Sequence, residues 1–160
     1  MSHSVIGIRE PGALDLVQSL LRQGFSVHIR VSGDSMKPLL RGGELVEVAP
    51  LRDARPKLGD ILFVRSRQNT PLVHRLIWRR NQNGISHLLT KGDACAGFDG
   101  FIPANKVIGR VDRIIIADQK SISLQVPLMR LRAVLSVSRV LLAHAWRKLN
   151  AYKKEYPPSI

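Results

Sequence analysis

The stretch from residue 72 to residue 90, LVHRLIWRRNQNGISHLLT, decides the fold. It contains two β-rich runs, Leu72–Arg79 and Ser86–Thr90, on either side of the dipeptide Asn83-Gly84. An Asn-Gly pair between two such runs is typical of a β-hairpin, because both residues accept the positive φ that a tight primed turn requires. The stretch therefore predicts an antiparallel pair of strands in the middle of the chain.

Further β-rich runs flank this hairpin, and turn residues such as Gly42-Gly43, Pro56 to Gly59 and Gly100 separate them. The other predicted strands are Ser26–Val31, Glu44–Val48, Asp60–Arg65, Val107–Ile116 and Ser121–Val126. Seven short strands without intervening helices favour a mostly β, antiparallel domain over a βαβ architecture.

Helical patterns stand at both ends of the β-rich region. A helix is expected over Ala13–Gln23, ended by Gly24, and its predicted apolar face carries Leu16, Val17, Leu20 and Leu21. After Pro127 an apolar stripe at helical spacing predicts a basic amphipathic helix, which either packs on the β domain or lies on anionic lipid or a partner. The expected organisation is a helical segment over 1–25, a β domain over 26–126 and a helical extension over 127–160.

Composition narrows the class of protein. The chain has 160 residues, 44% of them hydrophobic, which fits one globular domain with an appendage. The single cysteine, Cys95, excludes an internal disulfide framework and a Cys-rich zinc site, and no cofactor or metal is expected. Aromatic residues make up only 5%, which argues against a stacking platform for single-stranded nucleic acid.

The net charge of +13 favours anionic partners such as nucleic acid, an anionic membrane surface or an acidic protein. No nucleic-acid motif accompanies it, so no specific nucleic acid is predicted. The first residues lack the apolar core of a signal peptide, and no run is long enough to span a membrane. A cytoplasmic or peripheral membrane protein is expected.

Ser35 is the first residue that could do chemistry. It lies in GDSMKPLL, residues 33–40, on a predicted tight turn after a strand. Such a turn presents the hydroxyl and leaves the backbone N–H of Ser35 available as an oxyanion donor. The alternative is an ordinary polar turn serine.

His74 and two carboxylates complete the candidates. Strand alternation puts Leu72, His74, Leu76 and Trp78 on the more apolar face of their strand. Apolar surroundings disfavour a cation, and a neutral imidazole can accept a proton from a hydroxyl, although a core histidine is the plainer interpretation.

Asp93 or Asp99, both within TKGDACAGFDG at 90–100, could orient that imidazole. The alternative is two turn aspartates that cap their own backbone. Composition and spacing alone do not decide between these interpretations.

The order of these segments resembles the type I signal peptidase family, in the endoplasmic-reticulum and archaeal branch that uses Ser-His-Asp. The resemblance is carried by SMKP at 35–38, LGDILFV at 58–64, HR at 74–75, TKGD at 90–93 and VIGRV at 107–111. It covers roughly residues 26–116, and several boxes in the family's order are more specific than any one of them.

The resemblance implies a serine endopeptidase that cleaves a preprotein or leader peptide after small residues. It makes Ser35 the nucleophile and oxyanion donor, His74 the base, Asp99 the orienting acid and Asp93 a supporting carboxylate. It also implies a coiled, mostly antiparallel β domain, shared with the self-cleaving domain of LexA-type repressors. Gly33 replaces a serine that some members use in the oxyanion hole, and the family's usual membrane anchor has no counterpart in this sequence.

Two other functions remain open at this point. One is a LexA-like regulator that cleaves itself, at Ala94-Cys95-Ala96 or Ala143-His144-Ala145, although the first 25 residues are too few for a complete helix-turn-helix domain. The other is a non-catalytic module that binds polyanions through its basic surface. Lys91 belongs to the Lys-Gly-Asp box and is not taken as a second candidate base, although the sequence alone leaves a Ser-Lys dyad open.

Overall fold

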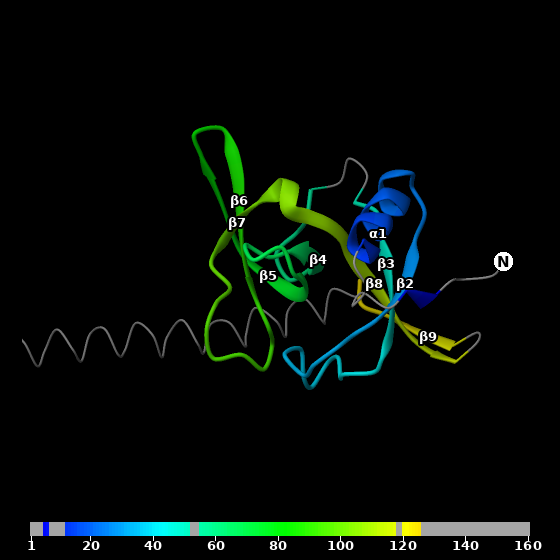
Figure 1. The fold of residues 1–160 in the computed structure, drawn as a ribbon. Coiled ribbons are helices and arrows are strands. Elements are labelled where there is room, and N and C mark those ends of the chain that lie inside the picture. The colour runs from blue at the N-terminus through cyan, green and yellow to red at the C-terminus, as the bar shows by residue number, and fades with distance from the viewer. Residues whose placement is uncertain (1–4, 7–11, 52–54, 118–119, 126–160) are drawn as a thin grey trace, which may run out of the picture.

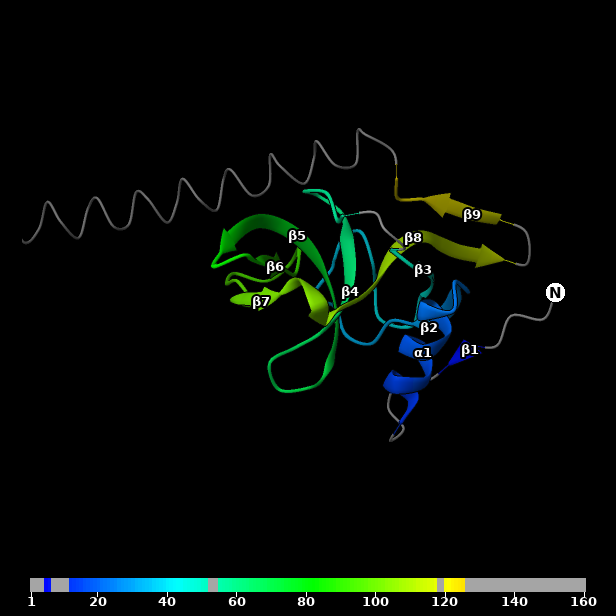
Figure 2. The same ribbon diagram turned by 90° about the horizontal axis from the view of Figure 1, so that it is seen from above.

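The computed structural model describes residues 5–6, 12–51, 55–117 and 120–125, and every structural statement below concerns these residues. They form one curled, largely antiparallel sheet with a single α-helix beside it (Figures 1 and 2). The mostly β fold expected from the sequence is confirmed. The elements are β1 (Val5–Ile6), α1 (Ala13–Arg22), β2 (Val27–Arg30), β3 (Leu45–Ala49), β4 (Ile61–Arg65), β5 (Pro71–Gln82), β6 (Ile85–Lys91), β7 (Phe101–Pro103), a 3-10 turn (Ala104–Lys106), β8 (Val107–Ala117) and β9 (Lys120–Ser123).

The sheet has the strand order β1-β2-β3-β8-β4-β5-β6-β7, and β9 pairs with β8. Only β1 and β2 are parallel among the strand pairs of the described residues. The sequence predicted seven strands, and β1 and β7 were missed. These strands have two and three residues, which is too short for an alternating pattern to show.

Two hydrophobic cores lie on the two faces of β4. Ile61 and Phe63 belong to the first core, whereas Leu62 and Val64 belong to the second. All four are at most 3% exposed, which explains why this strand reads as a continuous apolar run rather than as an alternating one. The first core also takes in α1, β2, β3 and the residues after β2, and the second takes in β5, β6 and β7.

Strand β8 joins the two halves of the sheet. Its register pairs Val107–Arg110 with β4 and Arg110–Ile115 with β3. Figure 1 shows β8 running between the group formed by β4 to β7 and the group formed by α1, β2 and β3. Gly109 lies where α1 comes close, since a Cβ there would be 2.6 Å from Val48 Cγ1 and 3.1 Å from Leu21 Cδ1.

Helix α1 ends where the sequence predicted, within one residue. Gly24 has φ +93°, its N–H donates to the Leu21 carbonyl, and the Phe25 N–H donates to the Leu20 carbonyl, which together form a Schellman motif. One expectation for the apolar face was wrong. Leu16 is 54% exposed, because Ala13, Val17 and Leu21 form the buried stripe instead.

The central hairpin is confirmed, with Asn83 at φ 52° and Gly84 at φ 75° in its turn. The expectation that Trp78 shares the buried face of His74 and Leu76 was wrong, because Trp78 is 56% exposed. A register shift between Leu76 and Trp78 inserts an extra residue against β6, and this bulge reverses the alternation beyond it.

The predicted helical extension over 127–160 and the last residue of the predicted strand Ser121–Val126 lie outside the described residues. None of the helices that the structure describes has the length and the apolar character needed to cross a bilayer.

Candidate active site

Ser35 lies in the turn that follows β2, and two kinds of contact fix this turn. Met36 and Leu40 are buried in the first core, 1% and 0% exposed. On the outer side, Asp34 accepts hydrogen bonds from Lys37 Nζ at 2.8 Å and from the Gly42 N–H at 3.2 Å. These bonds lower the pKa of the Asp34 carboxyl below its ordinary value, the Lys37 bond most.

His74 comes from β5, where it pairs with Leu62 of β4. It is 6% exposed, and its Nε2 lies 2.9 Å from Ser35 Oγ while its Nδ1 lies 2.6 Å from Asp99 Oδ2. A carboxylate only accepts hydrogen bonds, so Nδ1 carries the proton and Nε2 is the acceptor for the serine hydroxyl. The three side chains, here called the triad, therefore form one continuous hydrogen-bonded chain.

Asp99 is held in place by the end of β6. Thr90 Oγ1 donates to Asp99 Oδ2 at 2.8 Å, and the Asp99 N–H donates to the Thr90 carbonyl at 3.0 Å. The carboxylate thus accepts from Thr90 and His74 at the same oxygen, which fixes the direction in which it meets the imidazole.

Asp93 does not join the triad. Its two carboxylate oxygens accept from Arg75 Nε at 2.8 Å and Arg75 Nη2 at 2.6 Å, and Arg75 Nη1 donates to the Gly59 carbonyl at 2.9 Å. The Arg75 side chain is only 7% exposed. The sequence left open which aspartate meets the imidazole, and the structure brings Asp99 to it and pairs Asp93 with the neighbouring arginine.

The loop between β6 and β7 contacts the turn that carries Ser35. The Ala94 N–H donates to the Ser35 carbonyl at 2.8 Å. A Cβ built on Gly92 would be 2.7 Å from that carbonyl oxygen, 2.7 Å from Cys95 Sγ and 3.1 Å from His74 Nε2. Only glycine fits this point, because any side chain would displace Ser35, Cys95 or His74.

Lys91 is not predicted as the base, although the sequence alone leaves a Ser-Lys dyad open. Its side chain is buried, and its ammonium group donates to the Gly92 carbonyl at 3.0 Å. The imidazole of His74, and not this amine, is the group within hydrogen-bonding distance of Ser35 Oγ.

The triad opens onto a groove of about 760 Å³. The end of β2 and the residues after it, the start of β5 and one side chain of β4 line it: Ile29–Gly33, Ser35, Gly42, Gly43, Phe63 and Pro71–His74. Among the hydrogen bonds of the described residues, none uses the Ser35 backbone N–H. That N–H is therefore available to a ligand atom placed beside Ser35 Oγ.

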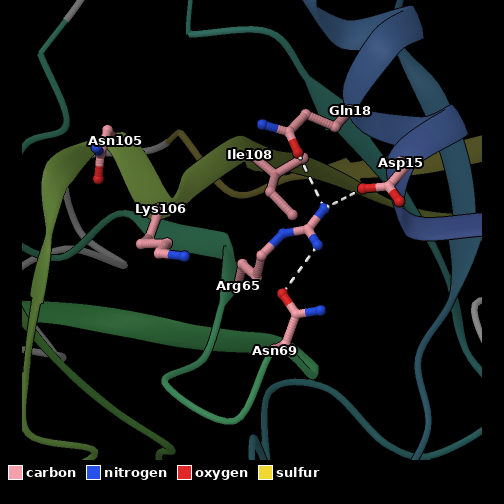
Figure 3. A pocket seen from close by; sticks show the side chains of 7 residues that line it. All are labelled: Asp15, Gln18, Arg65, Asn69, Asn105, Lys106 and Ile108. Atoms are coloured by element: carbon pink, nitrogen blue, oxygen red, sulfur yellow. Dashed lines mark hydrogen bonds and ion pairs between the residues drawn. The ribbon is translucent and has the colours of Figure 1, made fainter.

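A second, smaller pocket of about 340 Å³ lies apart from the triad residues (Figure 3). At its centre Arg65 of β4 donates to Asp15 at 2.5 Å, to Gln18 at 3.0 Å and to Asn69 at 2.9 Å. These bonds tie α1 to the end of β4. The arginine's donors are thus directed at protein acceptors, which indicates a structural role for this cluster.

The sequence analysis missed Thr90, Gly92 and Arg75 as parts of the site. Each lies within or directly beside a motif that was singled out, since Thr90 and Gly92 belong to TKGD and Arg75 follows His74. Their contacts, however, depend on how the loop at 92–99 folds back, which local pattern does not reveal.

Comparison with known proteins does not assign the chain to a family. No protein-family model matches the sequence, and no curated protein matches it.

Proposed function

We propose that the chain is a serine endopeptidase of the signal-peptidase type, with Ser35 as nucleophile, His74 as general base and Asp99 as the acid that orients the base. The observation that supports it most is the double contact of His74, 2.9 Å from Ser35 Oγ and 2.6 Å from Asp99 Oδ2. The order of the sequence boxes resembles the same family independently of this geometry.

Each group has a definite part in the reaction. Ser35 Oγ attacks the carbonyl carbon of the scissile peptide bond while His74 Nε2 takes the hydroxyl proton. Asp99 stabilises the imidazolium that forms, and the Ser35 N–H donates to the developing oxyanion. His74 then gives its proton to the leaving amine, and a water activated by His74 releases the acyl group from Ser35.

The groove beside the triad suits an extended peptide. The end of β2, the residues after it and the first residues of β5 border the groove. Backbone hydrogen bonds along such borders can hold an extended substrate peptide whatever its sequence. Contacts between the groove and the side chains of the peptide then select which residues are accepted. We expect small residues at the −1 and −3 positions, in a preprotein or the leader of a small peptide.

The test compares cleavage of a peptide library by the wild type, Ser35→Ala and His74→Ala. Either substitution should lower kcat/KM by at least about 10³-fold, because loss of either group removes nucleophilic attack. Ser121→Ala and His87→Ala are matched controls: Ser121 is exposed in β9, and His87 contacts the carbonyl of Ile85 in its own strand. Both controls should cleave at the wild-type rate, with circular dichroism showing an unchanged fold in all four variants.

The result also distinguishes the competing functions. Intact-mass measurement of the purified chain would reveal a shortened product if it cleaved itself instead. Wild-type turnover in either Ser35→Ala or His74→Ala would rule out the proposed mechanism. Salt-dependent retention on nucleic acid or lipid, without any peptidase activity, would favour the binding module.

A further inference from the structure

Arg30, the last residue of β2, is the one arginine or lysine among the described residues that line the groove. The other lining residues, apart from His74, are apolar, glycine, serine or proline. No carboxylate of the described residues lines this groove. A peptide lying here therefore meets one fixed positive charge and no compensating negative one.

The guanidinium of Arg30 is oriented by the backbone. Its Nη1 donates to the carbonyl of Gly43, at 2.5 Å, in the turn that leads into β3. This contact uses one of the five N–H donors of an arginine and leaves the rest free of a carboxylate. Holding the side chain in this way reduces the entropy that it loses when it binds a ligand.

Three arginines of the described residues form ion pairs with carboxylates. Arg65 pairs with Asp15, Arg75 with Asp93 and Arg110 with Asp112. Arg30 has no ion pair within the described part of the chain. Glu47 of the neighbouring strand lies 3.7 Å from His28, the residue across from it in the register.

We propose that Arg30 is a specificity residue that selects peptides with an aspartate or glutamate a few positions from the scissile bond. The inference rests on the proposed endopeptidase function and names the class of substrate for the same groove. Arginine suits this role because its planar fork binds both oxygens of a carboxylate. The net charge of +13 adds a long-range attraction for acidic peptides.

The expected preference is modest, because Arg30 is exposed to solvent. Solvent-exposed ion pairs change equilibria by at most about fivefold, and salt screens them. Added salt should therefore reduce the preference of the wild type for acidic peptides and leave its rate on neutral peptides less affected.

The experiment uses the full-length chain and matched peptides that differ at one position. Asp, Asn and Lys are placed in turn at each position from −5 to +3 around the cleaved bond, and kcat/KM is measured. At one position at least, the wild type should cleave the Asp peptide about fivefold faster than the Asn peptide. Arg30→Gln should bring this ratio to about one, and Arg30→Glu should favour the Lys peptide. Arg79→Gln, an exposed arginine of β5, is the matched control and should keep the wild-type ratio.

A binding measurement separates failure of this inference from failure of the proposed function. Fluorescence anisotropy of labelled Asp and Asn peptides with the Ser35→Ala variant measures peptide binding without cleavage. The Asp peptide should bind more tightly than the Asn peptide, and adding Arg30→Gln to this variant should abolish that difference in affinity. If peptides are cleaved through Ser35 but Asp and Asn peptides are cleaved equally at every position, the role of Arg30 is wrong while the function stands. A ratio that survives in Arg30→Gln also overturns it. If no peptide is cleaved, the function fails, and the anisotropy difference still decides the role of Arg30.

Discussion

Asp93 and Asp99 stand six residues apart in one loop, and they meet adjacent residues of β5 with different consequences. Asp99 contacts the imidazole of His74, whereas Asp93 forms a bidentate pair with Arg75. Successive side chains of a strand leave on opposite faces, so His74 and Arg75 direct the two carboxylates to opposite sides of the sheet. In the proposed function one carboxylate, Asp99, orients the base, while the other, Asp93, pairs with Arg75 and holds the loop that carries both.

The comparison shows that two carboxylates in similar sequence surroundings can have different roles, so that removing one should affect catalysis and removing the other should affect stability. Removing Asp99 should damage catalysis and spare the fold. Removing Asp93 should damage the fold and affect catalysis only through it. The substitutions below test this division of roles.

The largest effect is expected for Asp99→Asn. The amide can donate to Nδ1 and thereby favour the imidazole tautomer whose Nε2 carries the proton, which cannot accept the proton of Ser35. A comparable substitution in serine proteases lowers kcat about 10⁴-fold. Peptide cleavage kinetics should show a loss of that order, and urea unfolding should show a midpoint close to that of the wild type.

The control for this loss is Thr90→Val, which removes one hydrogen bond to Asp99 and leaves its contact with His74. Its loss of kcat should be much smaller than that of Asp99→Asn. A wild-type rate in Asp99→Asn would contradict the assignment of the orienting acid.

Asp93→Asn should destabilise the protein by about 3 kcal/mol, because it leaves the buried Arg75 cation without its anionic partner. Urea unfolding measures this loss, and the folded fraction should keep activity within about tenfold of the wild type. The double variant Arg75→Met/Asp93→Leu should recover much of the stability, since an apolar pair leaves no unpaired charge. A catalytic loss as large as that of Asp99→Asn, with full stability, would instead place Asp93 in the reaction.

Gly92→Ala should lower kcat/KM by about 100-fold. The added methyl group would lie 2.7 Å from the Ser35 carbonyl and 3.1 Å from His74 Nε2, so the hydroxyl and the imidazole must move apart. Misplacement of reacting groups by about 1 Å costs on this order. Gly97→Ala in the same loop is the control, because a Cβ there meets nothing within 4 Å, and it should cleave peptides like the wild type.

The smallest effect concerns Asp34, a third carboxylate next to the nucleophile. Hydrogen bonds from Lys37 and from the Gly42 N–H hold the pKa of Asp34 below its ordinary value. A depressed pKa in the folded state means that this carboxylate stabilises the fold at neutral pH and loses that contribution as the pH falls below about 4. An NMR titration of the carboxyl carbon should show the depression, and Lys37→Met should raise the pKa back towards the ordinary value. An unchanged titration in Lys37→Met would show that this bond is not the main cause.

The sequence predicted the fold well where local chemistry controls it. Asn83-Gly84 determined the hairpin, and Gly24 determined the end of α1. The prediction failed where the outcome depends on pairing between distant strands. The exposure of Trp78 follows from a bulge against β6, and β1 and β7 exist because neighbouring strands offer them partners.

The residues of the candidate site could be named from the sequence, but their contacts with one another could not be predicted from it. Ser35, His74 and Asp99 could be named from ordered motifs, but the choice between the two aspartates depends on which face of β5 each one meets. Arg30 drew no attention in the sequence, because nothing local distinguishes it from the other arginines. Its position in the lining of the groove is a property of the folded chain.

The two cores on opposite faces of β4 bear on how this protein would lose the proposed activity. The turn that carries Ser35 is anchored through Met36 and Leu40 in the first core, while Leu72 and Leu76, which flank His74 on its face of β5, pack in the second. A slip of one half against the other, by an ångström or so along the line where β4 meets β8, would part the hydroxyl from the imidazole while both halves kept their secondary structure. Peptide turnover would then fall at milder denaturing conditions than those at which spectroscopy detects unfolding.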